Sequence, residues 1–492
     1  MSAVSRRGIL KGIVGASIVL GFDPASRSWV TEARADGCLG LPALDGHMTT
    51  DASTCAAYAD DFGHMVHRTP YAVLFPESVQ DVVKMVKFAG AHGIKVGSRG
   101  RGHTAFGQSQ VVAGILVDMT TLGEIHSITS CYADVDAGVV WRDLILEAAA
   151  VGLTPAVLTD FTALTVGGTL SVGGINGRSY RHGAQVDNVL ELDVVTGEGK
   201  LVTCSPSQHK KLFHAVLAGM GLCAIIVRAK IRLIPAKEIA RTHRCFYPDV
   251  VSMLADLRVL SEEERFDHLR GNAQPTPSGW VWYIEGTSLF TPGNESNAGD
   301  PAALPLPAQP FAGLSYLAGS EQVEDRNYFE FTDQVVQLIT LLESLGLGGL
   351  PHPWLDLFVP DSEIDAFAVA SVAPLDISEF LPGSIILVFP FKKSKIEAPL
   401  FRVPDEENFF LFDILQTTPP DPSVIAATLQ RNRDLYDQAR ALGGTQYTIS
   451  AIPNMTKQDW KKHFKQQWEP LKDAKKKHDP DNVLGAGPGV FT

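Results

Sequence analysis

A run of glycines with basic and imidazole side chains, Gly97 to Gln108, carries the strongest chemical signal in the chain. Glycine permits unusual backbone angles, so successive main-chain N–H groups can point into one concavity and bind phosphate oxygens. Gly100, Gly102 and Ala105 fit the G-x-G-x-x-A dinucleotide pattern, which requires a helix to follow. The strand-forming run Gly114 to Val117 follows instead. The segment is therefore predicted to be a non-helical phosphate loop, although this motif alone also fits a turn without a ligand.

A second glycine-rich run spans Leu164 to Gly174 and contains two double glycines. Double glycines within an apolar stretch indicate backbone pressed against a flat ligand, or two backbones packed closely together. Taken alone, the run does not decide between these. Two such segments in one unit favour a dinucleotide over a mononucleotide. Asp160 lies between them in the sequence, so its carboxylate is expected to face the same ligand.

Local sequence patterns predict the helices and strands that hold these two segments in place. Ser78 is a predicted N-cap, and valines recur behind it at helical spacing. Alternation and the turn at Thr196 to Gly199 predict a hairpin over 189–203. Further helices are predicted over 139–151 and 329–345, a strand from Ile94, and a surface loop over 289–312. The lysines of the C-terminal helix, Lys472 and Lys475 to Lys477, are predicted to form a solvated face.

Length and composition limit the class of protein. A chain of 492 residues exceeds a single compact core, so two structural units are expected. The net charge of −13 disfavours binding to nucleic acid or to anionic membranes. Six cysteines without a C-x-x-C pair disfavour a disulfide scaffold and a zinc ribbon, and the histidines show no convincing metal partners. No metal site is predicted.

Residues 1–35 are predicted to be an export signal. Arg6 and Arg7 precede the apolar run Gly12 to Phe22, and Ala33-Arg34-Ala35 supplies a small-x-small cleavage pattern. The string Ser5 to Lys11 resembles the twin-arginine signal, which exports folded and often cofactor-loaded proteins. The apolar run is too short to span a bilayer, and no later segment approaches a span. We expect a periplasmic or extracellular protein without stable membrane insertion.

Several motifs in collinear order resemble one enzyme family. Gly100-Arg101-Gly102-His103-Thr104 resembles the flavin loop of the vanillyl-alcohol-oxidase (PCMH-type) FAD enzymes, and specifically of the cytokinin dehydrogenases. Leu158 to Phe161 resembles that family's Trp-Thr-Asp-Tyr, and Thr165 to Ser171 its second flavin loop. The resemblance covers about residues 60–492. It also includes Arg181 to Gly183, Glu191 to Gly197, Pro351 to Pro360, Val403 to Glu406 and the tail from Asp479 to Phe491.

The resemblance implies an α+β fold of two domains. An FAD-binding domain, made of two small α/β subdomains, is expected over 36–237 with a return over 441–492. A substrate domain with an antiparallel sheet flanked by helices is expected over 238–440.

The resemblance also implies the chemistry. The expected reaction is oxidative cleavage of an N6-substituted adenine to adenine and an aldehyde, by hydride transfer to flavin N5 and then to oxygen or a quinone. Asp160 would draw on the substrate N–H, and His103 would hold FAD covalently. Expected FAD contacts are Gly100, Arg101, Gly102, Thr104, Gln108, Asp160, Thr165, Gly167, Gly168 and Ser171. Expected substrate contacts are Glu285, Trp354, Asp356 and Phe389.

Some positions depart from the family pattern. Asp356 stands where the family usually has Asn, so a second negative charge would alter substrate preference or raise a carboxylate pKa if it faces the pocket. Ala224 stands where the family has a glycine. Pro488 stands where the family has the glutamine of a terminal Pro-Gly-Gln. No cysteine lies between Cys131 and Cys204, so a single histidyl link is expected. A related FAD oxidase for another amine or alcohol, and an exported flavin- or purine-binding protein without turnover, remain alternatives.

Overall fold

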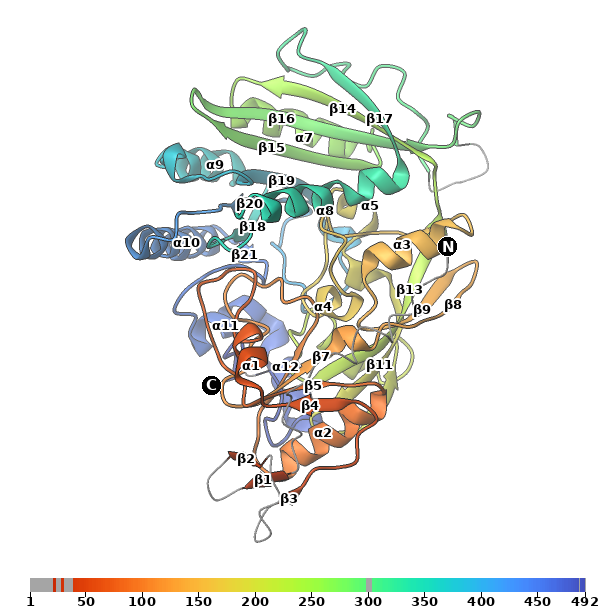
Figure 1. Ribbon diagram of the computed structural model, residues 1–492. Helices are drawn as coiled ribbons and strands as arrows, with labels where there is room; N and C mark the ends of the chain where they lie inside the picture. Colours follow the sequence, from red (N-terminus) through yellow and green to blue (C-terminus); the bar gives the residue numbers. More distant parts are fainter. Residues whose placement is uncertain (1–20, 24–27, 31–38, 298–302, 486, 492) are drawn as a thin grey trace.

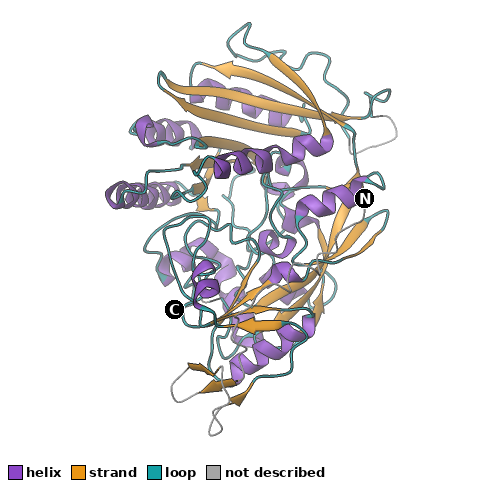
Figure 2. Ribbon diagram, viewed as in Figure 1, coloured by secondary structure: helices purple, strands orange, loops and turns teal. Residues whose placement is uncertain are grey.

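The computed structural model describes residues 21–23, 28–30, 39–297, 303–485 and 487–491. Helices and strands are interspersed throughout, as the α+β expectation requires (Figure 2). Two units lie one above the other in Figure 1. We call them the N-terminal unit, residues 39–237 together with 447–491, and the sheet unit, residues 238–446.

The first layer of the N-terminal unit is a four-stranded sheet. Its order is β4 (His47–Thr49), β5 (Ala72–Phe75), β7 (Ile115–Asp118) and β6 (Val96–Arg99), and β5, β7 and β6 run parallel. Helix α2 (Val79–Ala91) joins β5 to β6. Ser78 accepts a hydrogen bond from the Asp81 amide, so the predicted helix and its cap are confirmed. No helix separates β6 from β7, so the first glycine-rich segment is a loop, as predicted.

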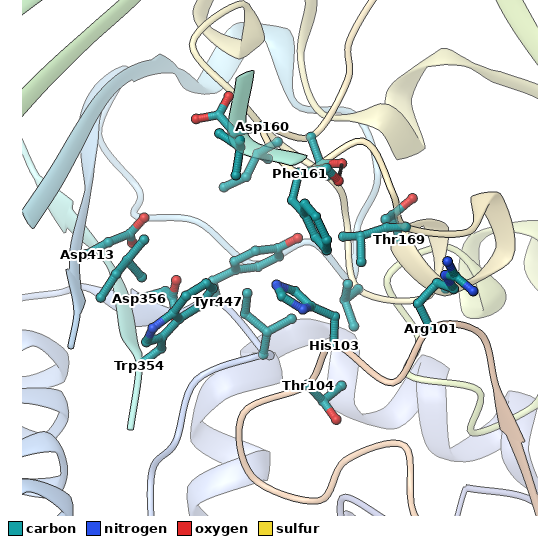
Figure 3. A pocket seen from close by; sticks show the side chains of 18 of the residues that line it. Arg101, His103, Thr104, Asp160, Phe161, Thr169, Trp354, Asp356, Asp413 and Tyr447 are labelled. Carbon is teal, nitrogen blue, oxygen red and sulfur yellow. Dashed lines mark hydrogen bonds between the residues drawn. The ribbon is translucent and has the colours of Figure 1, made fainter. Parts of the chain in front are cut away.

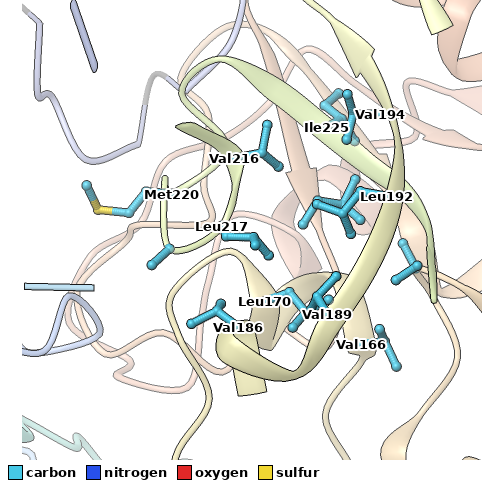
Figure 4. Packing of buried hydrophobic residues seen from close by; sticks show 14 of the residues in the cluster. Val166, Leu170, Val186, Val189, Leu192, Val194, Val216, Leu217, Met220 and Ile225 are labelled. Carbon is cyan, nitrogen blue, oxygen red and sulfur yellow. The ribbon is translucent and has the colours of Figure 1, made fainter. Parts of the chain in front are cut away.

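The second layer of the N-terminal unit is a six-stranded sheet. Its order is β12 (Leu201–Cys204), β11 (Val189–Thr196), β13 (Ala224–Pro235), β9 (Tyr132–Asp136) and β8 (Ile125–Ile128), with β10 (Leu153–Pro155) also on β13. The predicted hairpin is the antiparallel pair β11–β12. Helix α3 (Trp141–Ala149) matches the helix predicted over 139–151. Figure 4 shows part of the core that packs on this sheet, where Val189 of β11 lies beside Leu170 of the second glycine-rich segment and Val194 lies beside Ile225.

The sheet unit is built on an eight-stranded, wholly antiparallel sheet. Its order is β17 (Gln322–Asn327), β14 (Ile239–Tyr247), β16 (Gly279–Phe290), β15 (His268–Thr276), β19 (Ile385–Lys392), β20 (Asn408–Leu415), β18 (Leu355–Pro360) and β21 (Thr445–Gln446). Helices α7 (Val250–Glu262), α9 (Ile364–Val372) and α10 (Pro422–Ala441) bury apolar residues against one face. The sheet extends past the expected boundary at 440, because Thr445 and Gln446 pair with β18.

The other face of this sheet is turned toward the N-terminal unit. Alternate strand residues point to opposite faces, so each strand contributes one set to the helical core and the other to the space between the units. Phe412 and Ile414, for example, belong to the helix-covered core, whereas Leu411 and Asp413 line the opposite side. Helix α8 (Tyr328–Ser344), predicted over 329–345, also borders that space.

The remaining elements are short and complete the N-terminal unit or its connections. The C-terminal helices α11 and α12 lie in the lower unit beside elements from the start of the chain (Figure 1). The short strands are β1 (Gly21–Asp23), β2 (Ser28–Val30) and β3 (Leu39–Gly40). The helices are α1 (Ala52–Ala57), α4 (Val166–Leu170), α5 (Ser179–His182), α6 (Lys210–Val216), α11 (Lys457–Phe464) and α12 (Trp468–His478). The 3₁₀ turns are Met119–Thr121, Gln185–Asn188, Ile377–Glu379, Lys393–Lys395 and Lys465–Gln467.

Two local expectations are corrected. The second glycine-rich segment is not wholly a loop, because Val166 to Leu170 form the single turn α4, whose apolar side chains are buried in the core. The lysine run is not wholly solvated. Lys475 is 7% exposed and donates to Asp479 and to the carbonyl oxygens of Leu222 and Leu484, so it ties the tail to the N-terminal unit.

The predicted export signal is mostly outside the described residues, which include neither Arg6 and Arg7 nor the Ala33-Arg34-Ala35 pattern. In the part of the chain that the structure describes, no helix has both the length and the apolar character to cross a membrane.

Candidate active site

A cavity of about 560 Å³ lies between the two units. Its walls come from both glycine-rich segments, from helix α8 and from the uncovered face of the eight-stranded sheet. Figure 3 shows labelled side chains from both units pointing into it. Residues expected to bind FAD or substrate that line it are Gly100, Arg101, Gly102, His103, Thr104, Gln108, Asp160, Thr165, Gly167, Gly168, Ser171, Glu285, Trp354, Asp356 and Phe389.

Asp61 fixes the shape of the first glycine-rich loop. Its Oδ2 accepts hydrogen bonds from Thr104 Oγ1 at 2.7 Å and from the Gly107 amide at 2.6 Å, and its Oδ1 accepts from the Gly63 amide at 3.2 Å. Burial raises the pKa of Asp61 to about 6, although these hydrogen bonds oppose the shift. Nothing local marked Asp61 in the sequence, because its two partners in the glycine-rich loop, Thr104 and Gly107, lie more than forty positions away.

The two glycine-rich segments touch at Gly100. A Cβ placed there would lie 1.9 Å from Oγ1 of Thr165, so only glycine allows this approach. Gly102 has a φ of +67°, and a Cβ there would meet the Arg99 guanidinium at 2.3 Å. Arg99 in turn donates to the carbonyl oxygens of Tyr58 and Asp60, which anchors the base of the loop. The glycines therefore serve a close contact and a left-handed backbone, which the sequence alone left open.

His103 is enclosed by aromatic rings. Its ring centroid lies 3.9 Å from that of Phe62, 4.8 Å from that of Phe161 and 5.6 Å from that of Trp354. Burial, with a smaller contribution from nearby His352, lowers the pKa of His103 to about 3, so the imidazole is neutral at physiological pH. Among the described residues neither ring nitrogen has a hydrogen-bond partner, and the side chain faces the cavity (Figure 3). A neutral imidazole with a free nitrogen is able to form a covalent bond.

Asp160 is held by two residues of β15. Arg270 Nη1 donates to Asp160 Oδ2 at 3.1 Å, and His268 Nε2 lies 3.7 Å from Oδ1. Burial alone would raise the pKa of Asp160, but His268 and Arg270 outweigh it and hold the pKa below its ordinary value. The side chain is 22% exposed, into the same cavity as His103. The carboxylate is therefore ionised, fixed in place and able to accept a proton or a hydrogen bond.

Glu285 acts on this carboxylate through Arg270. Arg270 Nε donates to Glu285 Oε2 at 2.7 Å while its Nη1 donates to Asp160, so one guanidinium bridges both acids. Arg244 Nε donates to Glu285 Oε1 at 3.0 Å. Burial would raise the pKa of Glu285, but Arg270 and Arg244 lower it to about 2. Glu285 therefore lines the cavity in its ionised form and holds Arg270 in place.

The sheet wall of the cavity is largely apolar. Trp354 and Phe389 lie there with Leu387 and Leu411, which suits a flat, weakly polar ligand. Asp356 is an acidic residue within this apolar wall. The position at which the chain departs from the family's usual Asn therefore faces the cavity. Burial, rather than a neighbouring charge, raises its pKa to about 7, and the hydrogen bond from Ser450 opposes the shift.

Several predicted FAD contacts have partners within the protein. The Gln108 side-chain amide donates to the carbonyl oxygens of Thr448, Ile449 and Ser450, which attaches the returning segment to the first loop. Ser171 Oγ donates to the Gly167 carbonyl at 2.7 Å. Arg101 Nε donates to the Ala163 carbonyl at 3.3 Å and remains exposed. These side chains shape the cavity and leave their backbone to contact a ligand.

The other departures lie away from the cavity wall. Ala224 begins β13 and is buried, and neither it nor Pro488 lines the cavity. The lining contains no cysteine, and the five cysteines in the described residues are unpaired. Within the same described residues, no three His, Cys, Asp or Glu side chains gather as metal ligands would.

Several cavity residues carried no signal in the sequence. Arg270, Asp413 and Tyr447 all line it, and Tyr447 accepts a hydrogen bond from the Gly174 amide at 3.0 Å. Each lies on or beside a strand of the sheet unit, far in sequence from the glycine-rich segments. The only sequence feature at these positions is the alternation of side chains along a strand. This alternation does not show which face of the sheet meets the ligand.

The residues present fit the FAD expected from the sequence. The backbones of Gly100, Gly102, Gly167 and Gly168 line the cavity, and the neutral imidazole of His103 faces the same cavity.

Comparisons with known proteins agree with this geometry. The family profile described as "Cytokinin dehydrogenase 1, FAD and cytokinin binding" matches residues 272–491, and the "FAD binding domain" profile matches residues 70–205. The chain is 34% identical to "Uncharacterized oxidoreductase ORF5 in fasciation locus" of Rhodococcoides fascians, over 90% of this chain and 99% of that protein. It is 34% identical to "Cytokinin dehydrogenase 9" of Oryza sativa subsp. japonica, over 91% of each chain. It is 32% identical to "Cytokinin dehydrogenase 2" of Arabidopsis thaliana, over 92% of this chain and 95% of that protein.

Proposed function

The chain belongs to the cytokinin dehydrogenase family of FAD-dependent oxidoreductases, and from this premise we propose that it oxidatively cleaves the side chain of N6-substituted adenines. One observation carries the proposal. An ionised carboxylate, Asp160, is fixed by Arg270 in the cavity that also contains His103 and the apolar side chains of the sheet wall. The products would be adenine and an aldehyde.

Asp160 would act on the exocyclic amine of the substrate. Its carboxylate accepts the N6–H, which places electron density on the nitrogen as a hydride leaves the adjacent carbon. Arg270 prevents the carboxylate from turning away, because the same guanidinium is anchored on Glu285. The resulting imine takes up water and separates into adenine and the aldehyde. FAD, when bound, supplies the two-electron acceptor for the hydride.

His103 would be the single covalent anchor of FAD. Its neutral ring has a free nitrogen for the flavin 8α carbon, and Phe62 and Phe161 hold the ring in one orientation. The absence of cysteine from the cavity lining supports one link rather than two.

Trp354 and Phe389 would bound the adenine ring. Both lie on the apolar wall opposite the glycine-rich segments, where a flat heterocycle loses little hydration on binding. The twin-arginine-like start of the chain supports export of the FAD-loaded protein to the periplasm or beyond. Oxygen or a quinone would then accept the electrons.

Anaerobic mixing tests this function. We expect isopentenyladenine to bleach the flavin absorbance of the purified protein in a stopped-flow spectrometer. Asp160→Asn should keep its flavin but be reduced about a hundredfold more slowly, because an amide accepts the N6–H poorly. Asp473→Asn, an exposed aspartate of α12, is the matched control and should react as the wild type does.

Three outcomes would contradict this proposal. A flavin that other amines or alcohols bleach, but isopentenyladenine does not, would assign the cavity to another substrate class. Colourless purified protein would indicate binding without redox turnover. Unchanged reduction kinetics in Asp160→Asn would remove the role given to that carboxylate.

A further inference from the structure

Two buried aspartates face each other across strands of the cavity wall. Asp356 of β18 and Asp413 of β20 are direct register partners in an antiparallel pair. Directly opposed residues point to the same face, with Cβ atoms about 5 Å apart. Both line the cavity, and they are 3% and 4% exposed. Figure 3 shows the two side chains on the same side of the cavity, next to Tyr447 and Trp354.

This pair has unused hydrogen-bonding capacity. Asp356 Oδ2 accepts from Ser450 Oγ at 3.1 Å. Asp413 has no side-chain hydrogen bond among the described residues, and its Oδ1 is fully buried without a partner. Neither acid forms an ion pair there, because the nearby Arg270 is occupied by Glu285 and Asp160. A buried polar atom without a partner is costly unless a ligand satisfies it.

The pair retains a proton at neutral pH. Two adjacent buried carboxylates without a cation cannot both ionise at low cost. Burial raises the pKa of Asp356 to about 7, and burial together with the charges of Asp356 and Asp160 raises that of Asp413 well above its ordinary value. The other titratable group that faces them is Tyr447, just after β21, whose own pKa is raised by burial so that it stays neutral.

A singly protonated pair presents an O–H donor beside a carboxylate acceptor. Its complement is a ligand edge with a ring-nitrogen acceptor next to an N–H donor. Adenine carries such an edge at N3 and N9–H, at the opposite end of the ring from N6. Asp160, the acceptor assigned to N6–H, reaches the cavity from the N-terminal unit, whereas the pair reaches it from the sheet (Figure 3). All three acids line one cavity, so a flat purine bound there with N6–H on Asp160 would turn its opposite edge toward the pair.

We propose that Asp356 and Asp413 together recognise the N3/N9–H edge of the substrate and so make the enzyme selective for purines that are unsubstituted at N9. This inference rests on the proposed function, because it takes the substrate to be an N6-substituted adenine. Protonated carboxyl O–H donates to N3, and the partner carboxylate accepts N9–H. A ribosyl or methyl group at N9 removes that donor and brings bulk against the buried acids.

Binding without turnover tests the pair. Isopentenyladenine and its 9-methyl derivative are titrated into photoreduced holoenzyme under argon, and affinity is measured by calorimetry. We expect the wild type to prefer the unsubstituted base at least tenfold, as loss of a hydrogen bond to a charged group predicts. Asp356→Leu should abolish this preference, because it removes the carboxylate that accepts N9–H. Ile414→Val, on the neighbouring strand but in the core on the other face, should keep it.

A second variant separates recognition from general damage. Asp413→Asn offers a permanent N–H donor beside Asp356, so it should keep the N9 preference. In the wild type the affinity for isopentenyladenine should fall as pH rises from about 6 to about 9, because the shared proton that donates to N3 is lost, whereas Asp413→Asn should hold its affinity.

The failures of the two proposals are distinguishable. If isopentenyladenine bleaches the oxidised flavin but the wild type binds both ligands equally, the pair proposal is overturned and the proposed function stands. Retention of the preference in Asp356→Leu, or loss of it in Ile414→Val, overturns the pair proposal as well. If isopentenyladenine does not bleach the flavin at all, both proposals are overturned.

Discussion

His103 is a neutral, aromatic-enclosed histidine that lines the cavity. It is neutral because burial disfavours the imidazolium, and its ring is confined by Phe62, Phe161 and Trp354. A histidine kept for packing would usually satisfy its ring nitrogens with nearby polar groups. Among the described residues those of His103 have none. The ring nitrogens of the buried His463 also lack partners, but His103 differs because it lines the cavity, where a ligand can reach it.

Replacing His103 by Ala should release the flavin from covalent attachment. Acid precipitation of the wild type should leave the yellow colour in the pellet, whereas the variant should leave it in the supernatant. A tryptic peptide containing residue 103 should carry the added mass of FAD in the wild type only. His352→Ala provides the comparison, since it removes a neighbouring imidazole that stacks on Phe62 and leaves the anchor in place. Colour that stays with the pellet in His103→Ala would place the link elsewhere.

At the scale of elements, the cavity depends on close contact between two segments that are distant in the chain. Gly100 of the first loop lies against Thr165 at the start of α4, and α4 is fixed because its apolar residues lie in the core (Figure 4). Asp61 ties the first loop to the segment before β5. The loop therefore has little freedom to accommodate an added atom.

Gly100→Ala should push these segments apart and reduce the amount of flavin bound to purified protein several-fold. The added Cβ would lie 1.9 Å from Thr165 Oγ1, and overpacking of this kind costs about 1–3 kcal/mol. The ratio of flavin to protein absorbance measures the effect. Thr165→Ala in the same chain should restore part of the loss, because it removes the clashing oxygen. Gly349→Ala, where a Cβ meets nothing within 4 Å, is the control and should bind flavin normally.

For the whole molecule, the cavity is the junction of the two units. One hydrophobic cluster includes Val166 and Leu170 of the N-terminal unit together with Phe389 and Leu411 of the sheet unit. The units therefore share a core, and a ligand in the cavity touches both of them. Binding of FAD should consequently stabilise the entire chain against unfolding rather than the N-terminal unit alone.

Thermal unfolding of His103→Ala protein, from which the flavin has been removed, tests whether FAD stabilises the entire chain. Its midpoint, followed by tryptophan fluorescence, should rise by several degrees when FAD is added, since a ligand at about 100 times its Kd adds about 2.7 kcal/mol. A single transition is expected both with and without FAD. The wild type, already saturated, should not respond to added FAD. Two separate transitions, of which FAD shifts only one, would contradict a shared core.

Features that depend on neighbours in the chain were predictable. Ser78 caps its helix, the hairpin turns at 196–199, and the first glycine-rich segment is a loop, because each follows from a few adjacent residues. The order of the motifs was likewise enough to indicate the family and FAD, and His103 and Asp160 do face one cavity. Local patterns in the sequence thus identified two side chains that the fold brings into one cavity.

Their partners were decided only in three dimensions. Arg270 reaches Asp160 across 110 positions, Asp413 meets Asp356 through strand register, and Lys475 is buried by the carbonyl oxygens of two distant segments. Alternation along a strand shows that two sets of side chains exist but not which set faces a ligand. Register and the packing of the sheet against the N-terminal unit make that choice, because they minimise the free energy of the whole chain and leave no mark on any single segment.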